Sequence, residues 1–348
     1  MALPRTIIET DAAMIHALRL VRGVCQLAGP FALIDDAQAS LQRQGVIAAV
    51  KRHDTASLFD WLMNVLSYQG ISDRIAEQYL DQHGNITWAD VELTLMNKPS
   101  CPKLGGYWLF FDCKYQKWSG SCAKPDHMPA CPLPRHPLRN GRLNQTAYSL
   151  FLFIRDIAGG DLVQWIDDQL REYESQPTTD QIAAIQASLV GPLREVYGVS
   201  DKVITMAVSS LLIGAGARRR VWSEVGATFV VIDTLVHNFL HRTGILHRFN
   251  ADHAYGPACY QPHGCADLVE RIADHIDARS FNPRFPKTFP RFVQLAIWRY
   301  CSQSGRDICN GNRIDDRVRC ENLHCQLYSS CDRVKLHKTS KNNMNSKV

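Results

Sequence analysis

The chain has 348 residues, of which 45% are hydrophobic and 21% are charged. This makeup is typical of a globular protein with a substantial core and excludes wholesale disorder. The 39 Lys and Arg residues exceed the 34 Asp and Glu residues only because residues 333–348 hold five basic side chains and no acidic one, which leaves 34 of each sign in residues 1–332. Bulk charge therefore gives no argument for nucleic-acid binding.

The N-terminal sequence and the hydropathy pattern predict a cytoplasmic protein without a membrane segment. Glu9 and Asp11 lie where a secretory signal peptide needs an apolar run. The longest weakly polar stretch, residues 203–217, is shorter than the roughly 20 residues that a membrane-spanning helix needs. In a reducing compartment the 12 cysteines indicate metal ligands or buried thiols rather than disulfides.

Apolar residues recur at intervals of three and four along most of the chain, which predicts an all-α fold. Residues 1–54 are expected to form an N-terminal helical extension, and residues 55–98 and 145–300 the two parts of a helical core. Residues 214–228, rich in Gly and Arg, interrupt the pattern between two predicted helices, and residues 333–348 are expected to be a disordered basic tail. The apolar stripes of the core include Leu58, Trp61, Leu62, Val65, Val203, Ala207, Leu211, Val236, Phe239 and Leu240.

Residues 99–144 break the helical pattern with dense Pro, Gly, Cys and aromatic residues. A loop of this length is usually functional or separately stabilised. Its candidate metal ligands are Cys101, Cys113, Cys122 and Cys131, with His127 nearby. Zinc could staple a loop that is too poor in core to fold alone. The long gaps between these cysteines match no paired zinc knuckle, so a loop without metal stays equally open.

Residues 301–332 end in a group of cysteines spaced C-x10-C-x4-C-x5-C. They are Cys309, Cys320, Cys325 and Cys331. Iron–sulfur clusters take four cysteine thiolates and tolerate irregular loops between them, which favours a cluster here. A four-cysteine zinc site is the competing occupant, although no C-x2-C pair is present, and unrelated buried thiols are the alternative without a metal. Cys301 is close enough in sequence to be a substitute ligand, whereas Cys25, Cys259 and Cys265 carry no recognisable signal.

Two further residues stand where a helix is expected to begin. VYGVSDKVI predicts a glycine turn followed by a helix with Lys202 in its first turn. Backbone N–H groups of such a turn can hold a DNA phosphate, and the positive helix end disfavours an ammonium and so favours an amine nucleophile. Asp233 in VVIDTLVHN is expected at a helix N-cap, from which a carboxylate could also accept a proton or stabilise a positive sugar-like transition state. A solvated lysine and a plain capping residue are the simpler alternatives.

Taken in chain order, these segments resemble the helix-hairpin-helix DNA glycosylases, in particular the endonuclease III branch that carries a 4Fe-4S cluster. VYGVSDKVI is similar to the family's hairpin LPGVGxKTA, with Lys202 at the catalytic lysine and Gly198 and Ser200 at the positions that grip DNA. VIDTLV is similar to the VDTHV segment, with Asp233 at the catalytic aspartate. SGRDIC is similar to the phrase that carries the first cluster ligand, here Cys309.

An earlier segment, LFDWLMNVLSYQGISDRIAEQYL, resembles the helix and turn whose glutamine fills the gap left by an extruded base, with Gln69 as its counterpart. Asn64 stands where the adenine-removing branch has a catalytic glutamate, which disfavours adenine excision. The chain departs from the family pattern at Ser200, which replaces the second hairpin glycine, and in the wider spacings of the Lys–Asp pair and of the first two cysteines.

The resemblance implies two helical subdomains with a helix-hairpin-helix motif and a C-terminal iron–sulfur loop. It implies a monomeric, nucleoid-associated enzyme that acts on double-stranded DNA with a damaged base or an abasic site. Lys202 would attack the sugar, Asp233 would activate the lysine, and an oxidised base would be the expected substrate. The alternative is a non-catalytic, metal-stapled DNA-binding or scaffold protein that keeps the glycosylase fold.

Overall fold

The computed structural model describes residues 5–68, 73–97, 101–116, 121–123, 133, 142–171, 179–216 and 219–336. The described residues are mostly helical, which confirms the predicted all-α class. The strands among them are β1 (Tyr115–Gln116) and β2 (Ser121–Cys122), which pair in antiparallel register with Tyr115 opposite Cys122.

The chain divides into two compact units, and the division differs from the predicted order of segments. The terminal unit comprises residues 1–33 and 227–348, and the middle unit comprises residues 34–226. The first helix therefore lies in the same compact unit as the C-terminal third of the chain. Which segments act as functional domains stays a prediction.

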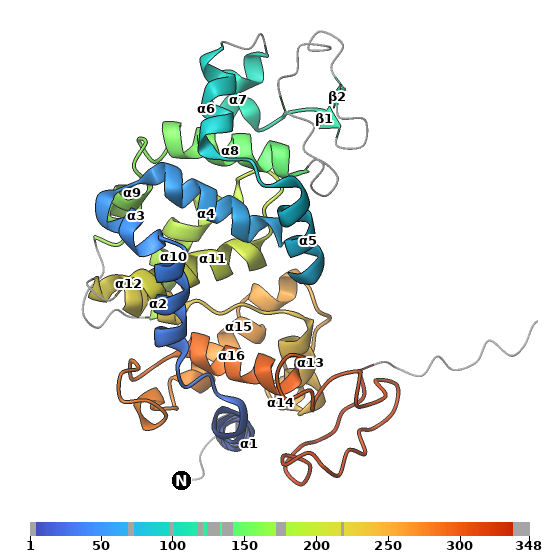
Figure 1. The fold of residues 1–348 in the computed structure, drawn as a ribbon. Helices are drawn as coiled ribbons and strands as arrows, with labels where there is room; N and C mark the ends of the chain where they lie inside the picture. The colour runs from blue at the N-terminus through green and yellow to red at the C-terminus, as the bar shows by residue number, and fades with distance from the viewer. Residues whose placement is uncertain are drawn as a thin grey trace, which may run out of the picture. The chain divides into compact units, whose positions relative to one another are not determined.

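The terminal unit is built on the packing of α1 (Arg5–Ala28) against α14 (Ile245–Arg248), α15 (Cys265–Ala273) and α16 (Pro290–Cys301) (Figure 1). Helix α13 (Thr234–Arg242) also packs against α16. Pro290 opens α16 at a position where no N–H is needed. Short 3₁₀ helices cover Pro257–Tyr260 and Ala278–Ser280. The core side chains of this unit include Leu20, Val24, Phe239, Phe292 and Tyr300, all fully buried.

The middle unit is built around α4 (Thr55–Ser67), which packs against α3 (Val46–Arg52), α6 (Trp88–Met96), α8 (Arg142–Asp156), α9 (Leu162–Gln169) and α11 (Asp201–Ala215). The apolar face of α4 is buried as predicted, and Leu58, Phe59 and Leu62 are 0–3% exposed. The remaining helices are α2 (Leu33–Arg43), α5 (Asp73–His83), a 3₁₀ helix (Pro102–Gly105), α7 (Tyr107–Phe110), α10 (Thr179–Arg194) and α12 (Arg220–Thr228).

The break expected at residues 214–228 is largely helical, because α12 occupies Arg220–Thr228. The Ser209 hydroxyl of α11 donates to the Gly226 carbonyl at 2.9 Å, and Gly226 allows the two helices to approach closely, since a Cβ there would lie 2.8 Å from Leu212. The Trp222 indole N–H donates to Asp167 of α9 at 2.7 Å. Residues 220–228, which the sequence pattern left irregular, are therefore a helix packed against α9 and α11.

Among the described residues, no single helix has the length and apolar character to cross a membrane. The bent pair Ala12–Ala28 and Leu33–Arg43 meets both criteria together, by length and composition alone.

Candidate functional site

The turn between α10 and α11 places Lys202 as the sequence predicts, in the first turn of α11. Gly198 adopts φ +76°, a left-handed conformation that favours glycine. Ser200 occupies the N-cap position without a side-chain capping hydrogen bond. Arg194, at the end of α10, pairs with Asp201, the first residue of α11, at 3.4 Å. The turn thus joins α10 and α11 through a left-handed glycine, and an ion pair connects the ends of the two helices.

Helix α8 supports this turn from one side. The Thr146 hydroxyl donates to the Tyr197 carbonyl at 2.8 Å, and the Tyr197 N–H donates to the Ser149 hydroxyl at 3.0 Å. A Cβ on Gly198 would lie 3.2 Å from the Thr146 hydroxyl oxygen. The turn also lines a cavity of about 270 Å³, together with Tyr107, Phe111 and Ser149. Contacts with α8 therefore hold the turn in place beside this cavity.

Asp233 is the N-cap of α13, as the sequence predicts, and is 8% exposed. Its carboxylate accepts the Val236 N–H at 3.0 Å. The preceding residue, Ile232, is clamped by the Tyr260 hydroxyl, which accepts the Ile232 N–H at 3.0 Å and donates to the Ile232 carbonyl at 3.1 Å. Burial lowers the pKa of Arg291 to about 10, and electrostatic interactions with Tyr260 and with the Asp233 carboxylate oppose that shift. The buried guanidinium of Arg291 therefore interacts electrostatically with Asp233, the predicted catalytic carboxylate.

Lys202 belongs to the middle unit and Asp233 to the terminal unit, so each is described within its own unit. Gln69 lies outside the described residues. The cooperation of the three residues in one site remains a prediction.

The cysteines of the C-terminal loop gather after α16, in a stretch of described residues without helix. Burial raises the pKa of Cys331 to about 12, and charges on Cys309, Cys325 and Cys320 add to that shift, so the sulfur atoms lie within electrostatic reach of one another. Cys301, a substitute ligand by sequence, is fully buried, and its hydrogen bond lowers the pKa of Cys309 to about 7.

Polar groups surround these thiols. The Arg333 N–H donates to the Cys331 sulfur at 3.4 Å, and the Tyr300 hydroxyl lies 3.2 Å from the Cys325 sulfur. The buried guanidinium of Arg242 donates to the Cys309 carbonyl at 3.0 Å and pairs with Asp316. Polar groups therefore lie around several of these sulfurs, as they do around metal-bound thiolates. Whether the predicted 4Fe-4S cluster or zinc binds the four thiols stays a prediction.

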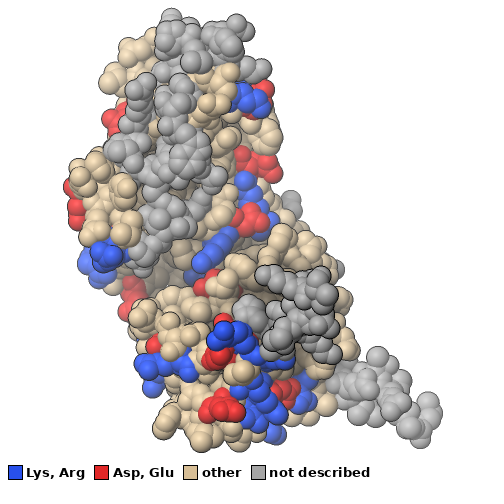
Figure 2. Space-filling model, turned by 90° about the vertical axis from the view of Figure 1, so that its right-hand side faces the viewer, with Lys and Arg blue, Asp and Glu red and all other residues tan. Residues whose placement is uncertain are grey.

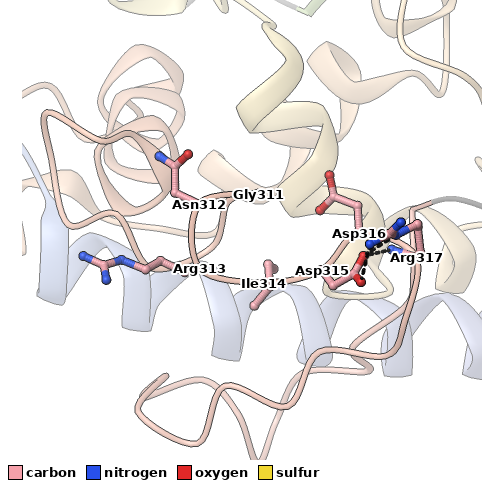
Figure 3. A pocket seen from close by; sticks show the side chains of 7 residues that line it. All are labelled: Gly311, Asn312, Arg313, Ile314, Asp315, Asp316 and Arg317. Atoms are coloured by element: carbon pink, nitrogen blue, oxygen red, sulfur yellow. Dashed lines mark hydrogen bonds and ion pairs between the residues drawn. The ribbon is translucent and has the colours of Figure 1, made fainter.

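The same loop encloses a hollow of about 590 Å³ lined by residues 311–317 (Figure 3). Arg317 lies against Asp315, with two hydrogen bonds of 2.9 and 3.0 Å. Arg313 pairs with Asp307 at 3.0 Å. These arginines are therefore ion-paired within the loop, and a DNA phosphate would have to compete with the carboxylates.

The cysteine-rich segment is described only in part. Burial raises the pKa of the Cys113 thiol, and charges on Cys101 and Cys122 contribute, so these sulfurs lie near one another. Cys131 and His127 lie outside the described residues. The predicted zinc site therefore stays a prediction.

The structure brings together a further group of metal-ligating side chains that the sequence analysis missed. The ligand atoms of His237, His253, Cys259 and Cys265 all lie within 4.8 Å of one another, so this group could bind a metal ion. The hydrogen bond from Cys265 lowers the pKa of the Cys259 thiol to about 3, while the same bond raises the pKa of Cys265. The only sequence signal was the repeated spacing H-x15-H-x5-C-x5-C, which matches no common zinc motif.

Comparison with protein-family models, curated proteins and solved structures finds no match to this chain.

Proposed function

We propose that this protein is a DNA repair glycosylase with abasic-site lyase activity, which removes a damaged, oxidised base through a Schiff base on Lys202. The observation that carries the proposal is the position of Lys202, in the first turn of α11 directly after the left-handed turn at Gly198. Its partner would be double-stranded DNA in the nucleoid, bound by a monomer.

The α10–α11 turn would hold the DNA backbone. Backbone N–H groups at a helix start can bind phosphate without reading sequence, and the positive end of α11 would add to the attraction. The left-handed Gly198 lets the backbone approach the duplex where a side chain would intervene. The damaged nucleotide would leave the stack, since its glycosidic carbon is shielded inside the duplex.

The chemistry would use two side chains. The uncharged Lys202 amine attacks the anomeric carbon, the glycosidic bond breaks, and the base departs with the bonding electron pair and a proton. The bond between C1′ and the ring oxygen then breaks, the ring oxygen takes a proton from solvent, and the opened sugar is left as a protonated Schiff base on Lys202. This Schiff base makes the C–H bond at C2′ acidic, so loss of that proton expels the 3′ phosphate and cuts the strand. Asp233 would accept the proton from the attacking amine and balance positive charge on the sugar.

The C-terminal loop would have a supporting role. Cys309, Cys320, Cys325 and Cys331 are the residues that would hold an iron–sulfur cluster, which would fix the fold of a loop without helices. The chemical steps above use only side chains of the protein.

The proposal is tested by incubating the protein with a duplex that contains an oxidised pyrimidine, in the presence of borohydride. A trapped protein–DNA adduct is expected for the natural chain and for the control Lys51→Ala, an exposed lysine of α3. Lys202→Ala should form none, and Asp233→Asn, which keeps a capping side chain, should lose most of the adduct while staying folded. An adduct that survives Lys202→Ala would refute the assigned nucleophile.

A second candidate function is favoured by Ser200, which occupies the N-cap position of α11 and replaces the hairpin's second glycine. A non-catalytic DNA-binding or scaffold protein would bind the duplex but leave an abasic site uncut. Binding measured by fluorescence anisotropy, together with cleavage of an abasic duplex, separates the two functions.

A further inference from the structure

We propose that His237, His253, Cys259 and Cys265 form a tetrahedral zinc site that fixes the segment carrying Asp233. The metal site stands on its own geometry. Only its link to catalysis rests on the proposed function, through the role of Asp233.

The distances between ligand atoms match those around a tetrahedral zinc ion. The Nδ1 atom of His237 lies 3.3 Å from the Cys265 sulfur and 3.5 Å from the Cys259 sulfur, and the Nε2 atom of His253 lies 3.3 Å from the Cys265 sulfur. Zinc bonds of about 2.3 Å to sulfur and about 2.0 Å to nitrogen at tetrahedral angles place the two atoms roughly 3.5 Å apart. The four ligand atoms therefore already surround a space of the right size.

The orientation of His253 fits a metal ligand. Its Nδ1 atom lies 2.6 Å from the Ala251 carbonyl oxygen, an acceptor, so Nδ1 carries the proton and Nε2 is left with a lone pair toward the sulfurs. Histidine ligands in metal sites almost always donate their other N–H in this way.

Burial and ligand chemistry favour zinc. Cys259 and Cys265 are fully buried and His237 is 5% exposed, so the group is shielded from water. Two thiolates and two imidazoles suit zinc, whereas calcium and magnesium prefer oxygen ligands. All ligands come from the terminal unit: His237 from α13, Cys259 from the 3₁₀ helix Pro257–Tyr260 and Cys265 from the start of α15.

The site is joined to Asp233 by two short paths. His237 lies one turn after Asp233 on α13, and its N–H donates to the Asp233 carbonyl at 3.0 Å. Tyr260, the neighbour of Cys259, clamps the backbone of Ile232 through its hydroxyl. A metal that fixes His237 and Cys259 therefore holds the chain on both sides of Asp233, and the four ligands act as positioning residues.

The first experiment measures zinc and iron in the purified full chain. The natural chain should contain one more zinc ion per molecule than Cys259→Ser/Cys265→Ser, and the exposed His263→Ala should match the natural chain. Cys320→Ser/Cys325→Ser should keep this zinc, which separates the site from the C-terminal loop. His253→Cys should also keep the zinc, because it supplies a third thiolate. If the double variant fails to fold, this variant still tests the site, because its ligand set differs from that of the natural chain.

The second experiment replaces zinc with cobalt and records the visible spectrum. Tetrahedral ligand-field bands with a thiolate charge-transfer band are expected in the natural chain, with a stronger thiolate band in His253→Cys. Equal zinc in the natural chain and in His253→Ala, or absence of the tetrahedral bands, would overturn the site. Loss of free Cys259 and Cys265 thiols through a mutual disulfide in the purified chain would overturn it as well.

The link to Asp233 is tested by Tyr260→Phe, which removes the clamp on Ile232 and leaves the ligands intact. Zinc content should stay unchanged, while kcat on an abasic duplex should fall roughly thirtyfold, the effect of the two hydrogen bonds that the hydroxyl makes to Ile232, at unchanged KM. An unchanged kcat would overturn the positioning role. Because zinc content is read without DNA, failure of the proposed enzyme activity and failure of the metal site give different results.

Discussion

Two buried arginines of the terminal unit have polar partners that offset the free-energy cost of removing their charges from water. Arg242 is 3% exposed, yet its guanidinium contacts the Cys309 carbonyl and Asp316. Arg291 is 8% exposed, donates to Gln294 and feels the charge of Asp233. Removing one partner from such a pair would leave a buried charge, which usually costs several kcal/mol.

Glu270 of α15 has a half-buried carboxyl group, and its surroundings disfavour the charged form. Burial, with added repulsion from Asp267 and Asp274, raises the pKa of Glu270 from its ordinary 4.5 to about 7. Between these values the folded chain binds more protons than the unfolded chain, so this group makes the folded state less stable as pH rises from 4.5 to 7.

Glu270→Gln is therefore expected to raise the free energy of unfolding at pH 8 by up to about 3 kcal/mol and to flatten its pH dependence between 4.5 and 7. Urea unfolding across this pH range measures both effects. The matched control is Glu92→Gln, an exposed residue of α6, which should change neither. A destabilised Glu270→Gln at pH 8 would contradict the assigned environment.

At the scale of elements, helix ends decide where the candidate residues lie. Asp54, Asp161 and Asp233 each cap a helix through a backbone N–H, so local sequence signals set the starts of α4, α9 and α13. The α10–α11 turn depends instead on Gly198, whose left-handed backbone also has Thr146 close by. The position of Lys202 therefore depends on a glycine.

Gly198→Ala is expected to lower the free energy of unfolding by about 1–2 kcal/mol, because alanine is strained at a positive φ. It should also weaken duplex binding if the turn holds a phosphate. Gly159→Ala is the matched control, since Gly159 has φ +63° and nothing within 4 Å of an added Cβ. Similar destabilisation with equal duplex affinity in both variants would show that the turn does not bind DNA.

At the scale of the whole molecule, basic and acidic residues balance along residues 1–332. On the face shown in Figure 2, Lys and Arg side chains are interspersed with Asp and Glu side chains. Residues 333–336 belong to the packed structure, because the Val334 N–H donates to the Arg242 carbonyl at 2.8 Å and the Leu336 N–H to the Asp316 carbonyl at 2.9 Å. The predicted basic tail should therefore be removed only from residue 337 onward.

Deletion of residues 337–348 removes Lys338, Lys341 and Lys347. Duplex affinity should fall, and the slope of log K against log salt should lessen by up to about 2–3, since each neutralised phosphate contributes about 0.9. Abasic-site cleavage at saturating DNA should persist. Deletion from residue 333 should in addition destabilise the cysteine loop, which thermal unfolding would detect. An unchanged salt slope would show that the tail does not contact DNA.

The sequence by itself determined the helical class, the placement of Lys202 in a first helical turn and the capping role of Asp233. These features depend on local chemistry: the spacing of apolar residues such as Leu58 and Leu62, a glycine turn, and a side chain that caps its own helix.

Only the tertiary structure decided which distant segments come together. It joined α1 to the C-terminal helices, gave residues 220–228 a helix packed on α11, and converged His237 and His253 on Cys259 and Cys265. No local pattern specifies such contacts, because the four ligands come from separate segments of the terminal unit that packing brings together. For that reason the clearest group of metal-ligating side chains among the described residues includes two cysteines whose spacing matches no common zinc motif.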